Sequence, residues 1–552
     1  VGLFILAGAY EFFQRFFLLW NAGSQFGALG AFCTLWLLVL ISLIGACLIR
    51  NGILRWLLAL LLAAGAVTID SYQWSVGDFM DYEAFVTMIH SSGDFSEALA
   101  QHRQVIVLAL GKAIVLFIGV GLKPAVSTSL FAKLSKSLSV PIIITLTAIL
   151  FFRGGDGANG LPSSHSGLSF GILFSYEYLT EDRHPREGVK IKPVQPEAAA
   201  DIVLIIDESI AGAYLDINSE TGVYSGLMNP TTKVPVHNFG LAAAITNCSV
   251  GSNVTLRYGG TRDNYRDTIK SKPSIWAFAK AADIETIYID AQRTGGAYQN
   301  LMNDAERALI DRWDQFGDVS VLYRDQAVAD RLSEYLNDEK QQFILVNKIG
   351  AHFPVSDKFP KTHAHYAPML KRRFADVSEA PPDNLDGRQS NWVLYRNSYR
   401  NTLVWNVGGF FDRLFAKSDI GEAMIIYTSD HGQTFHERGE YGEATHCTSS
   451  PEIEEGVVPL ILIGGMAAER KLWTNAALAN HDRLSSYRIF PTLLRAMGYG
   501  DTDVEDSYGF NMTSAEPDPF TFNIKFNARL GSEPVWMHIP IAKIARPPAS
   551  DY

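Results

Sequence analysis

The chain is poor in cysteine and in clustered positive charge, and it contains no internal repeat. Four cysteines in 552 residues exclude a small scaffold held together by disulfides. A net charge of −11 and the lack of a basic, aromatic-rich patch argue against a nucleic-acid partner. No long low-complexity tract is present either, so the length predicts several folded domains.

The cysteines fall into two pairs. Cys33 and Cys47 lie in an apolar stretch, whereas Cys248 and Cys447 lie in the more polar remainder of the chain. With the topology predicted below, the second pair lies in an oxidising compartment, where a disulfide is stable. A disulfide and a pair of free, buried thiols both fit the sequence.

Residues 1–155 are far more apolar than the rest and predict a transmembrane domain. Crossing a bilayer takes about 20 apolar residues in a helix. Five stretches approach that length: residues 2–20, 26–49, 54–68, 105–122 and 139–152. Glu11 and Arg15 make the first the most polar, but side chains four residues apart can pair on one helix face.

Loop charges predict the orientation of these five helices. Residues 21–25 lack Lys and Arg, the second loop contains Arg50 and Arg55, and the loop of residues 70–104 is long and mostly acidic. The fourth loop contains Lys123, Lys133 and Lys136. The positive-inside rule then places the N-terminus in the cytoplasm, so the chain after about residue 154 lies outside it.

Residues 156–200 are expected to connect this domain to a soluble one. The apolar but interrupted segment of residues 161–179 predicts a helix lying along the membrane surface. Residues 181–200 are charged and contain prolines, which is typical of a linker. The catalytic domain is therefore expected to comprise residues 201–552.

Three short apolar runs in this domain each lead to residues that can bind a transition metal. Residues 201–206 lead to Glu208, residues 343–346 lead to His352, and residues 424–427 lead to Asp430 and His431. Such runs predict buried parallel strands, and ligands gather beyond the carboxyl ends of such strands. Alone, an Asp-His-Gly turn or a Glu after a strand is commonplace, but together they predict a site. Mixed oxygen and nitrogen ligands suit zinc.

A nucleophile is expected in residues 246–255, which hold Ser249, Ser252 and Thr255. A hydroxyl needs a base or a metal to become a good nucleophile. Sulfatases that oxidise a Cys or Ser to formylglycine require x-Pro-x-Arg after it, and Cys248, Ser249 and Ser252 lack that pattern. That oxidised-cysteine chemistry is therefore not expected.

The chain resembles the membrane-bound phosphoethanolamine transferases of the alkaline phosphatase and sulfatase superfamily. The resemblance rests on Glu208-Ser209, Cys248 to Ser252, residues 350–354, Ser429-Asp430-His431-Gly432, and His446, in that order. It covers nearly the whole chain. It implies an N-terminal five-helix transmembrane domain and a C-terminal α/β alkaline-phosphatase-like (sulfatase-like) domain in the periplasm of a bacterial inner-membrane protein.

The resemblance also implies roles for individual residues. It implies zinc ligands at Glu208, Ser252, Asp430 and His431, with Ser252 in the position of the family's threonine nucleophile. His352 and His446 resemble the pair that binds the transferred group or protonates the leaving oxygen. A donor-binding role is implied for Lys358, Ser91 and Glu97.

Several positions depart from the family pattern and leave the substrate open. Ile210 stands where the family has an arginine, Arg257-Tyr258 replaces Pro-Cys, and serine replaces threonine as the nucleophile. Ser249 and Thr255 therefore stay alternative nucleophiles.

The function implied is transfer of phosphoethanolamine from phosphatidylethanolamine to lipid A or another envelope glycan, through a covalent serine intermediate. A phosphoglycerol transferase and a periplasmic phosphodiesterase or phosphatase would use nearly the same chemistry. A catalytically silent membrane scaffold is a further alternative, but it would have no chemical need for Glu208, Asp430 and His431 together.

Overall fold

The computed structural model describes the chain except for residues 1, 22–25, 77–78, 91–94, 123–129, 181–184, 195–200, 229–233, 373–388, 440–444, 449 and 549–552. The chain divides into two compact units. A helical unit comprises Val1–Arg183 and Asn527–Glu533, and a sheet unit comprises His184–Phe526 and Pro534–Tyr552. The domain boundaries drawn from the sequence stay predictions.

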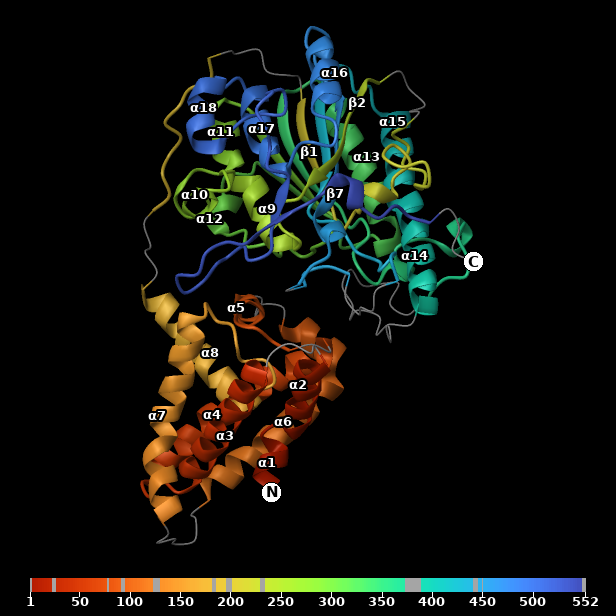
Figure 1. Ribbon diagram of the computed structural model, residues 1–552. Coiled ribbons are helices and arrows are strands. Elements are labelled where there is room, and N and C mark those ends of the chain that lie inside the picture. The colour runs from red at the N-terminus through yellow and green to blue at the C-terminus, as the bar shows by residue number, and fades with distance from the viewer. Residues whose placement is uncertain are drawn as a thin grey trace. The chain divides into compact units, whose positions relative to one another are not determined.

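The helical unit consists of apolar helices joined by short connections (Figure 1). Its elements are α1 (Gly2–Leu6), α2 (Ala9–Asn21), α3 (Phe26–Cys47), α4 (Gly52–Val76), α5 (Tyr82–His90), α6 (Phe95–Gly121), α7 (Leu130–Phe152) and α8 (Ser163–Thr180). Among the described residues, four stretches are long and apolar enough to cross a membrane: Gly27–Cys47, Gly52–Ser75, Arg103–Gly121 and Ser135–Phe152. The expected fold class is confirmed.

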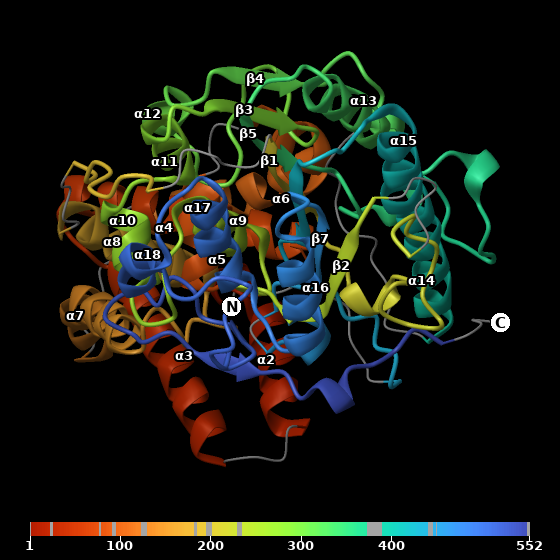
Figure 2. The ribbon, with the colours of Figure 1, turned by 90° about the horizontal axis from the view of Figure 1, so that it is seen from above.

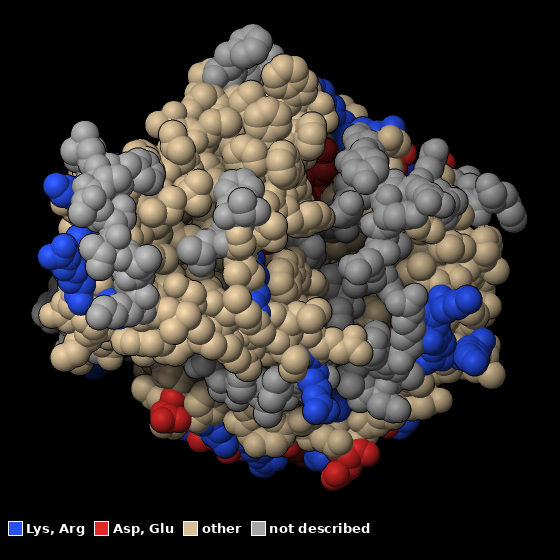
Figure 3. All heavy atoms as spheres, turned by 90° about the horizontal axis from the view of Figure 1, so that it is seen from below, with Lys and Arg blue, Asp and Glu red and all other residues tan. Residues whose placement is uncertain are grey.

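The first expected span differs from the others because it is broken. A turn at Ala7 and Gly8 separates α1 from α2, and Gly8 has a φ of 116°. That conformation is open to glycine and costly for other residues. Uncharged side chains cover most of the described part of the face drawn in Figure 3.

Polar side chains inside the helical unit are paired with one another. Lys112 of α6 lies 2.9 Å from Asp70 of α4 and 3.7 Å from Glu11 of α2. Asp70 also accepts a hydrogen bond from the hydroxyl of Ser163 at the start of α8. Polar groups at membrane depth need such partners, so this cluster ties four helices together.

Helix α8 packs its first half into the helical unit. Ser163, His165 and Ser169 are buried, and a Cβ placed on Gly167 would meet the backbone of Gly65 in α4 at 2.5 Å. Small residues allow such close approach of membrane helices. Tyr176 and Tyr178 in the second half are exposed, and the expectation of a helix along the membrane surface stays a prediction.

The sheet unit is built on seven strands in the order β2-β7-β6-β1-β5-β3-β4. These are β1 (Asp201–Asp207), β2 (Val236–Ala243), β3 (Glu285–Asp290), β4 (Arg312–Gln315), β5 (Gln342–Asn347), β6 (Met424–Ser429) and β7 (Val457–Gly464). β1 is parallel to both β5 and β6, and the three apolar runs found in the sequence are these three strands. β7 runs antiparallel to β6 and β2, and β8 (Thr521–Asn523) pairs with β9 (Trp536–His538) apart from this sheet.

Helices cover both faces of the sheet (Figures 1 and 2). Side chains alternate along a strand, so Val203 and Ile205 of β1 join one buried cluster and Ile202 and Leu204 join the other. The first cluster packs against α13 (Arg324–Leu336), α14 (Gln389–Leu403) and α15 (Gly409–Lys417). The second packs against α9 (Ser249–Tyr258), α11 (Ile275–Ala281), α16 (Arg470–Ala479), α17 (Ile489–Ala496) and α18 (Asp501–Tyr508). α10 (Tyr265–Ser271) and the short α12 (Asp304–Arg307) complete the α-helices described in this unit.

Candidate active site

The carboxyl ends of β1 and β6 bring three metal-binding side chains together. Asp207 of β1 pairs in register with Ser429 of β6, and each strand ends at that pair. Glu208 follows β1 directly, and Asp430 and His431 follow β6 directly. Residues more than two hundred positions apart in sequence thereby become neighbours, as the strand-end argument predicts.

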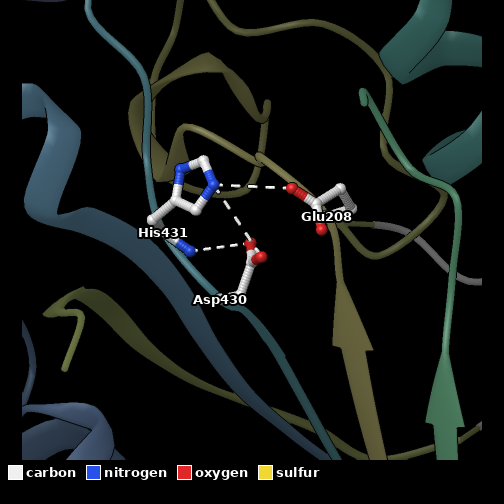
Figure 4. A group of neighbouring side chains, drawn as sticks. All are labelled: Glu208, Asp430 and His431. Atoms are coloured by element: carbon white, nitrogen blue, oxygen red, sulfur yellow. Dashed lines mark hydrogen bonds and ion pairs between the residues drawn. The ribbon is translucent and has the colours of Figure 1, made fainter. Parts of the chain in front are cut away.

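Glu208, Asp430 and His431 form a buried group able to hold a metal ion (Figure 4). One ligand atom from each lies within 4.8 Å of the others. His431 Nε2 is 3.4 Å from Glu208 Oε1 and 3.8 Å from Asp430 Oδ2. All three side chains point toward one another, so one cation between them could contact all three.

Hydrogen bonds orient Asp430 and His431 and leave one atom of each directed at the centre of the group. Asp430 Oδ1 accepts bonds from the backbone N–H of Ser209 and His431, at 3.0 and 2.8 Å. Asp430 Oδ2 is buried and has no hydrogen-bond partner among the described residues. His431 Nδ1 lies 2.7 Å from the Gly432 carbonyl, which fixes the ring so that Nε2 remains available. Ligating histidines are typically oriented in this way.

Electrostatics also favours a cation here. Burial raises the pKa of Asp430 to about 7, and the nearby Glu208 carboxylate adds to the rise. Burial opposes the charged form of His431, but Asp430 and Glu208 outweigh it and its pKa rises to about 9. Two buried carboxylates held this close repel each other unless positive charge lies between them. The buried Asp430 Oδ2 and the two adjacent carboxylates are both compatible with a divalent metal ion at this position.

Gln292 supports the group from the loop after β3, and the sequence analysis missed it. Its Nε2 donates to Glu208 Oε2 at 3.1 Å and to the Lys348 carbonyl at 2.7 Å. Its side chain is buried. A signal was available, because Asp290 and Gln292 follow the short apolar run Ile287-Tyr288-Ile289.

A buried ionic network lies behind the group. Lys348 Nζ is 2.5 Å from Asp207 Oδ2 and 3.8 Å from Asp325 Oδ2, and all three side chains are fully buried. The Asp325 carboxylate accepts hydrogen bonds from the backbone N–H groups of Ile349 and Gly350, at 2.9 and 3.0 Å. The network therefore fixes the loop that leads from β5 to His352.

The structure brings Ser249, rather than Ser252, to the metal-binding group. Ser249 is the first residue of α9, and its Oγ lies 3.2 Å from Glu208 Oε1 and 3.3 Å from His431 Nε2. The Ser252 Oγ instead accepts the N–H of Thr246 at 3.2 Å and is buried. Ser252 is one turn further into α9, so its hydroxyl meets the preceding loop and not the ligands. The Thr255 hydroxyl donates a hydrogen bond to the Gly251 carbonyl oxygen at 2.8 Å, within α9.

The two predicted histidines lie beside the group. The His446 ring stacks on the His431 ring, with 4.4 Å between ring centroids. His352 follows β5, and its Nδ1 lies 2.8 Å from the Phe353 carbonyl oxygen. Phe353 lies between them, with its ring centroid 4.7 Å from that of His352 and 6.1 Å from that of His446.

Of the three residues expected to bind the donor, the structure describes the side chain of Lys358. Lys358 is fully buried, and its charge acts on Asp325 of the ionic network. It therefore lies in the interior behind the site. Ser91 lies outside the described residues. Glu97 falls within α6, and its side chain is likewise outside the described part.

Cys248 and Cys447 form a disulfide, with 4.9 Å between their Cα atoms. The alternative of two free thiols is therefore wrong for this pair, whereas Cys33 and Cys47 are free. Cys248 directly precedes Ser249, and Cys447 directly follows His446, so the bond joins two segments of the site.

A mostly parallel sheet with an acidic and histidine group at its strand ends agrees with the resemblance to the alkaline phosphatase and sulfatase superfamily. A family model described as Sulfatase matches residues 201–499, and the chain belongs to the sulfatase family.

Two relatives share 22% identity with this chain, and both are named Kdo(2)-lipid A phosphoethanolamine 7''-transferase. The match to the Salmonella typhimurium protein covers 56% of this chain and 53% of that protein. The match to the Escherichia coli protein covers 43% and 40%. The chain thus spans about half, or less, of the length of these curated relatives.

A solved structure shares the fold of both units. The integral membrane protein lipooligosaccharide phosphoethanolamine transferase A from Neisseria meningitidis superposes with a TM-score of 0.62 at 16% identity. The superposition covers 90% of this chain and 95% of that one. This shared fold, the family model and the two relatives together confirm the resemblance found in the sequence.

Proposed function

We propose that this protein is a zinc-dependent phosphoethanolamine transferase. The observation that carries the proposal is the Ser249 hydroxyl, which lies within 3.3 Å of both Glu208 and His431 at the buried metal-binding group. Two carboxylates and one imidazole form a ligand set that suits zinc. Bound there, zinc would lower the pKa of a hydroxyl ligand and neutralise charge on a phosphoryl group.

Ser249 is the nucleophile in this proposal, in place of Ser252. It is half-buried and therefore reachable by substrate, whereas Ser252 is buried. It also starts α9, where unpaired backbone N–H groups favour an anionic phosphate. Glu208, Asp430 and His431 hold the metal, and Gln292 keeps Glu208 in place.

The reaction has two displacements. The Ser249 hydroxyl gives its proton to solvent and Oγ attacks phosphorus in phosphatidylethanolamine, while the bond from phosphorus to the diacylglycerol oxygen breaks. His352 gives that oxygen a proton, and phosphoethanolamine stays on Ser249. Burial and the neighbouring His431 hold the pKa of His446 well below its usual range, so neutral His446 binds the transferred group instead. An acceptor hydroxyl or phosphate oxygen then attacks phosphorus, any proton it carries passes to His352, the bond from phosphorus to Ser249 Oγ breaks, and Ser249 takes up a proton from solvent. Positioning and charge neutralisation dominate such transfers.

Several observations support the substrates. The two curated relatives are named for transfer of phosphoethanolamine to Kdo(2)-lipid A. The four apolar helices would keep the sheet unit at a bilayer, where a phospholipid donor and a glycolipid acceptor both reside. We therefore propose lipid A or another envelope glycan as acceptor. We also propose a bacterial inner-membrane location with residues 201–552 in the periplasm.

Peptide mapping after incubation with phosphatidylethanolamine tests the nucleophile. We expect the added phosphoethanolamine mass on Ser249, and no adduct and no transfer in Ser249→Ala. Ser252→Ala and Thr255→Ala are matched controls from the same helix and should keep transfer activity. An adduct on Ser252, or full activity of Ser249→Ala, would overturn the assignment.

Mass spectrometry of envelope lipids with and without the protein tests the transferred group. A phosphoethanolamine increment on lipid A or another glycan is expected. A phosphoglycerol increment, or free phosphoethanolamine released to water, would contradict the proposal. For orientation, alkaline phosphatase fused after Tyr552 should be active in a bacterial host, and an inactive but well-expressed fusion would contradict the periplasmic placement.

A further inference from the structure

The segment before Ser249 and the segment after His446 are bound to each other at several points. The Cys248–Cys447 disulfide joins them covalently. The Cys447 N–H donates to the Asn247 carbonyl at 3.0 Å, and Asn247 Nδ2 donates to the Thr448 carbonyl at 3.1 Å. The two segments are almost two hundred residues apart in the chain, so these contacts between distant positions help to bring them together.

Glu455 binds both segments through its side-chain carboxylate. Its Oε2 accepts Asn247 Nδ2 at 2.9 Å, and its Oε1 accepts the Thr448 hydroxyl at 2.8 Å. The Glu455 backbone carbonyl accepts the N–H of Gly432 at 2.9 Å, next to His431. The side chain is buried, where an ionised carboxylate needs such donors. One residue thus contacts the loops of the nucleophile, of His446 and of the metal ligands.

The backbone at Cys447 is held in an unfavourable conformation. Its φ of 57° lies in the left-handed region, which residues other than glycine adopt at a cost. Strain of this kind persists only where the surroundings impose it, and it is common at active sites. Here the surroundings are the disulfide and the hydrogen bonds to Asn247. Cys447 is exposed, so a reductant in solution can reach the bond.

We propose that the disulfide, Asn247, Thr448 and Glu455 form a loop clamp that positions Ser249 and His446 for phosphoryl transfer. Transfer then depends on the redox state of this disulfide. A dithiol reductant opens the clamp by thiol–disulfide exchange: the Cys248–Cys447 bond breaks, each sulfur ends as a thiol, and the reductant becomes a disulfide. This inference rests on the proposed function and concerns regulation of the same site.

The clamp is expected to control catalysis and not metal binding. Glu208, Asp430 and His431 are fixed by the ends of β1 and β6 and by hydrogen bonds that do not involve the disulfide. Ser249 and His446 are each bound to a clamp cysteine through one peptide bond. A displacement of about 1 Å at a reacting group can cost about a hundredfold in rate. Reduction should therefore lower kcat and leave the zinc content unchanged.

Reduction of the full-length protein in detergent is the first test. Cys33→Ala/Cys47→Ala removes the free thiols, so only the clamp responds to dithiothreitol. We expect kcat for transfer from phosphatidylethanolamine to fall at least tenfold, with zinc retained by elemental analysis, and to recover on reoxidation. Cys248→Ser/Cys447→Ser should be equally slow and insensitive to dithiothreitol. Full activity after complete reduction, or loss of zinc on reduction, overturns the proposal.

Glu455→Gln is the second test and leaves the disulfide in place. The amide offers a donor where Asn247 and Thr448 both need an acceptor, so kcat should fall while zinc stays bound. Glu454→Gln is the matched control, because Glu454 is also buried but pairs with Arg438 instead. The cysteine and Glu455 changes should be less than additive, since both open one clamp.

Additive effects, or equal effects of Glu454→Gln and Glu455→Gln, would overturn the role of Glu455. Failure of the proposed function is distinguishable, because the unmodified, oxidised protein would then transfer nothing.

Discussion

Replacing Lys348 by methionine should destabilise the sheet unit strongly. Methionine keeps most of the volume but removes the ammonium that lies 2.5 Å from Asp207 and 3.8 Å from Asp325. All three side chains are fully buried, so water cannot take the place of the lost charge. Removing one partner of a buried ion pair typically costs about 3–5 kcal/mol. We expect a loss of that size in the free energy of unfolding.

The loss should also depend on pH. Burial raises the pKa of Asp207 to about 6 even though Lys348 opposes the rise. Without Lys348 the pKa should rise further, so the folded state of the variant keeps a proton that the unfolded state releases. Stability then falls as the pH rises through this range. The variant should be closer to the unchanged protein at pH 6 than at pH 8.

Denaturant unfolding of the full-length protein in detergent, followed by tryptophan fluorescence, measures both effects. Lys417→Met is the matched control, because Lys417 lies 2.6 Å from Asp330 but both side chains are partly exposed. Exposed pairs contribute at most about 1 kcal/mol. If Lys348→Met and Lys417→Met cost the same, or if the loss with Lys348→Met shrinks toward high pH, the reasoning from burial is refuted.

Three further predictions concern the site and its sheet. Asp430→Asn should lose zinc, measured by elemental analysis, because the buried Oδ2 becomes part of a neutral amide; a zinc-replete variant would contradict the ligand assignment. Gln292→Leu should weaken zinc affinity about 10- to 100-fold in a chelator competition, since Glu208 loses its orienting donor; an unchanged affinity would remove Gln292 from the site. Burial and the neighbouring Asp338 raise the pKa of Asp201 to about 7, so this carboxyl lowers stability as the pH rises from about 4 to 7. Asp201→Asn should therefore raise the free energy of unfolding, measured by denaturant, more at pH 8 than at pH 4. An equal increase at both pH values would contradict this reasoning.

The strands that position the site were predictable because their burial on both faces requires continuous apolar runs in the sequence. Strands covered by helices on both faces must be apolar on both, so β1, β5 and β6 appear as continuous apolar runs. A polar residue that ends such a run is then placed at the edge of the sheet. Glu208, Asp430 and His431 were found by this argument. Gln292 obeys the same argument after β3, but glutamine is not a metal ligand of the expected kind.

The first membrane helix was less predictable. A hydropathy profile reports the apolar content of residues 2–20 but not the turn at Gly8. Gly8 has a φ of 116°, and this turn separates α1 from α2. Similarly, Lys358 has the charge expected of a donor-binding residue, but its burial beside the ionic network depends on tertiary packing.

The choice between Ser249 and Ser252 is the part of the site that the sequence predicts least well. Residues three apart lie on the same face of a helix, with about 4.5 Å between them along the axis. Ser249 and Ser252 are therefore nearly equivalent in a sequence pattern, and the choice between them depends on where α9 begins. α9 begins at Ser249, directly after Cys248, which the disulfide holds against the His446 segment. Part of what holds Cys248 is local, because the Thr246 hydroxyl donates to the Cys248 carbonyl at 2.6 Å and accepts the Cys248 N–H at 2.9 Å. The disulfide to Cys447 is not local, so a pattern in residues 246–255 cannot contain the whole choice between the two hydroxyls.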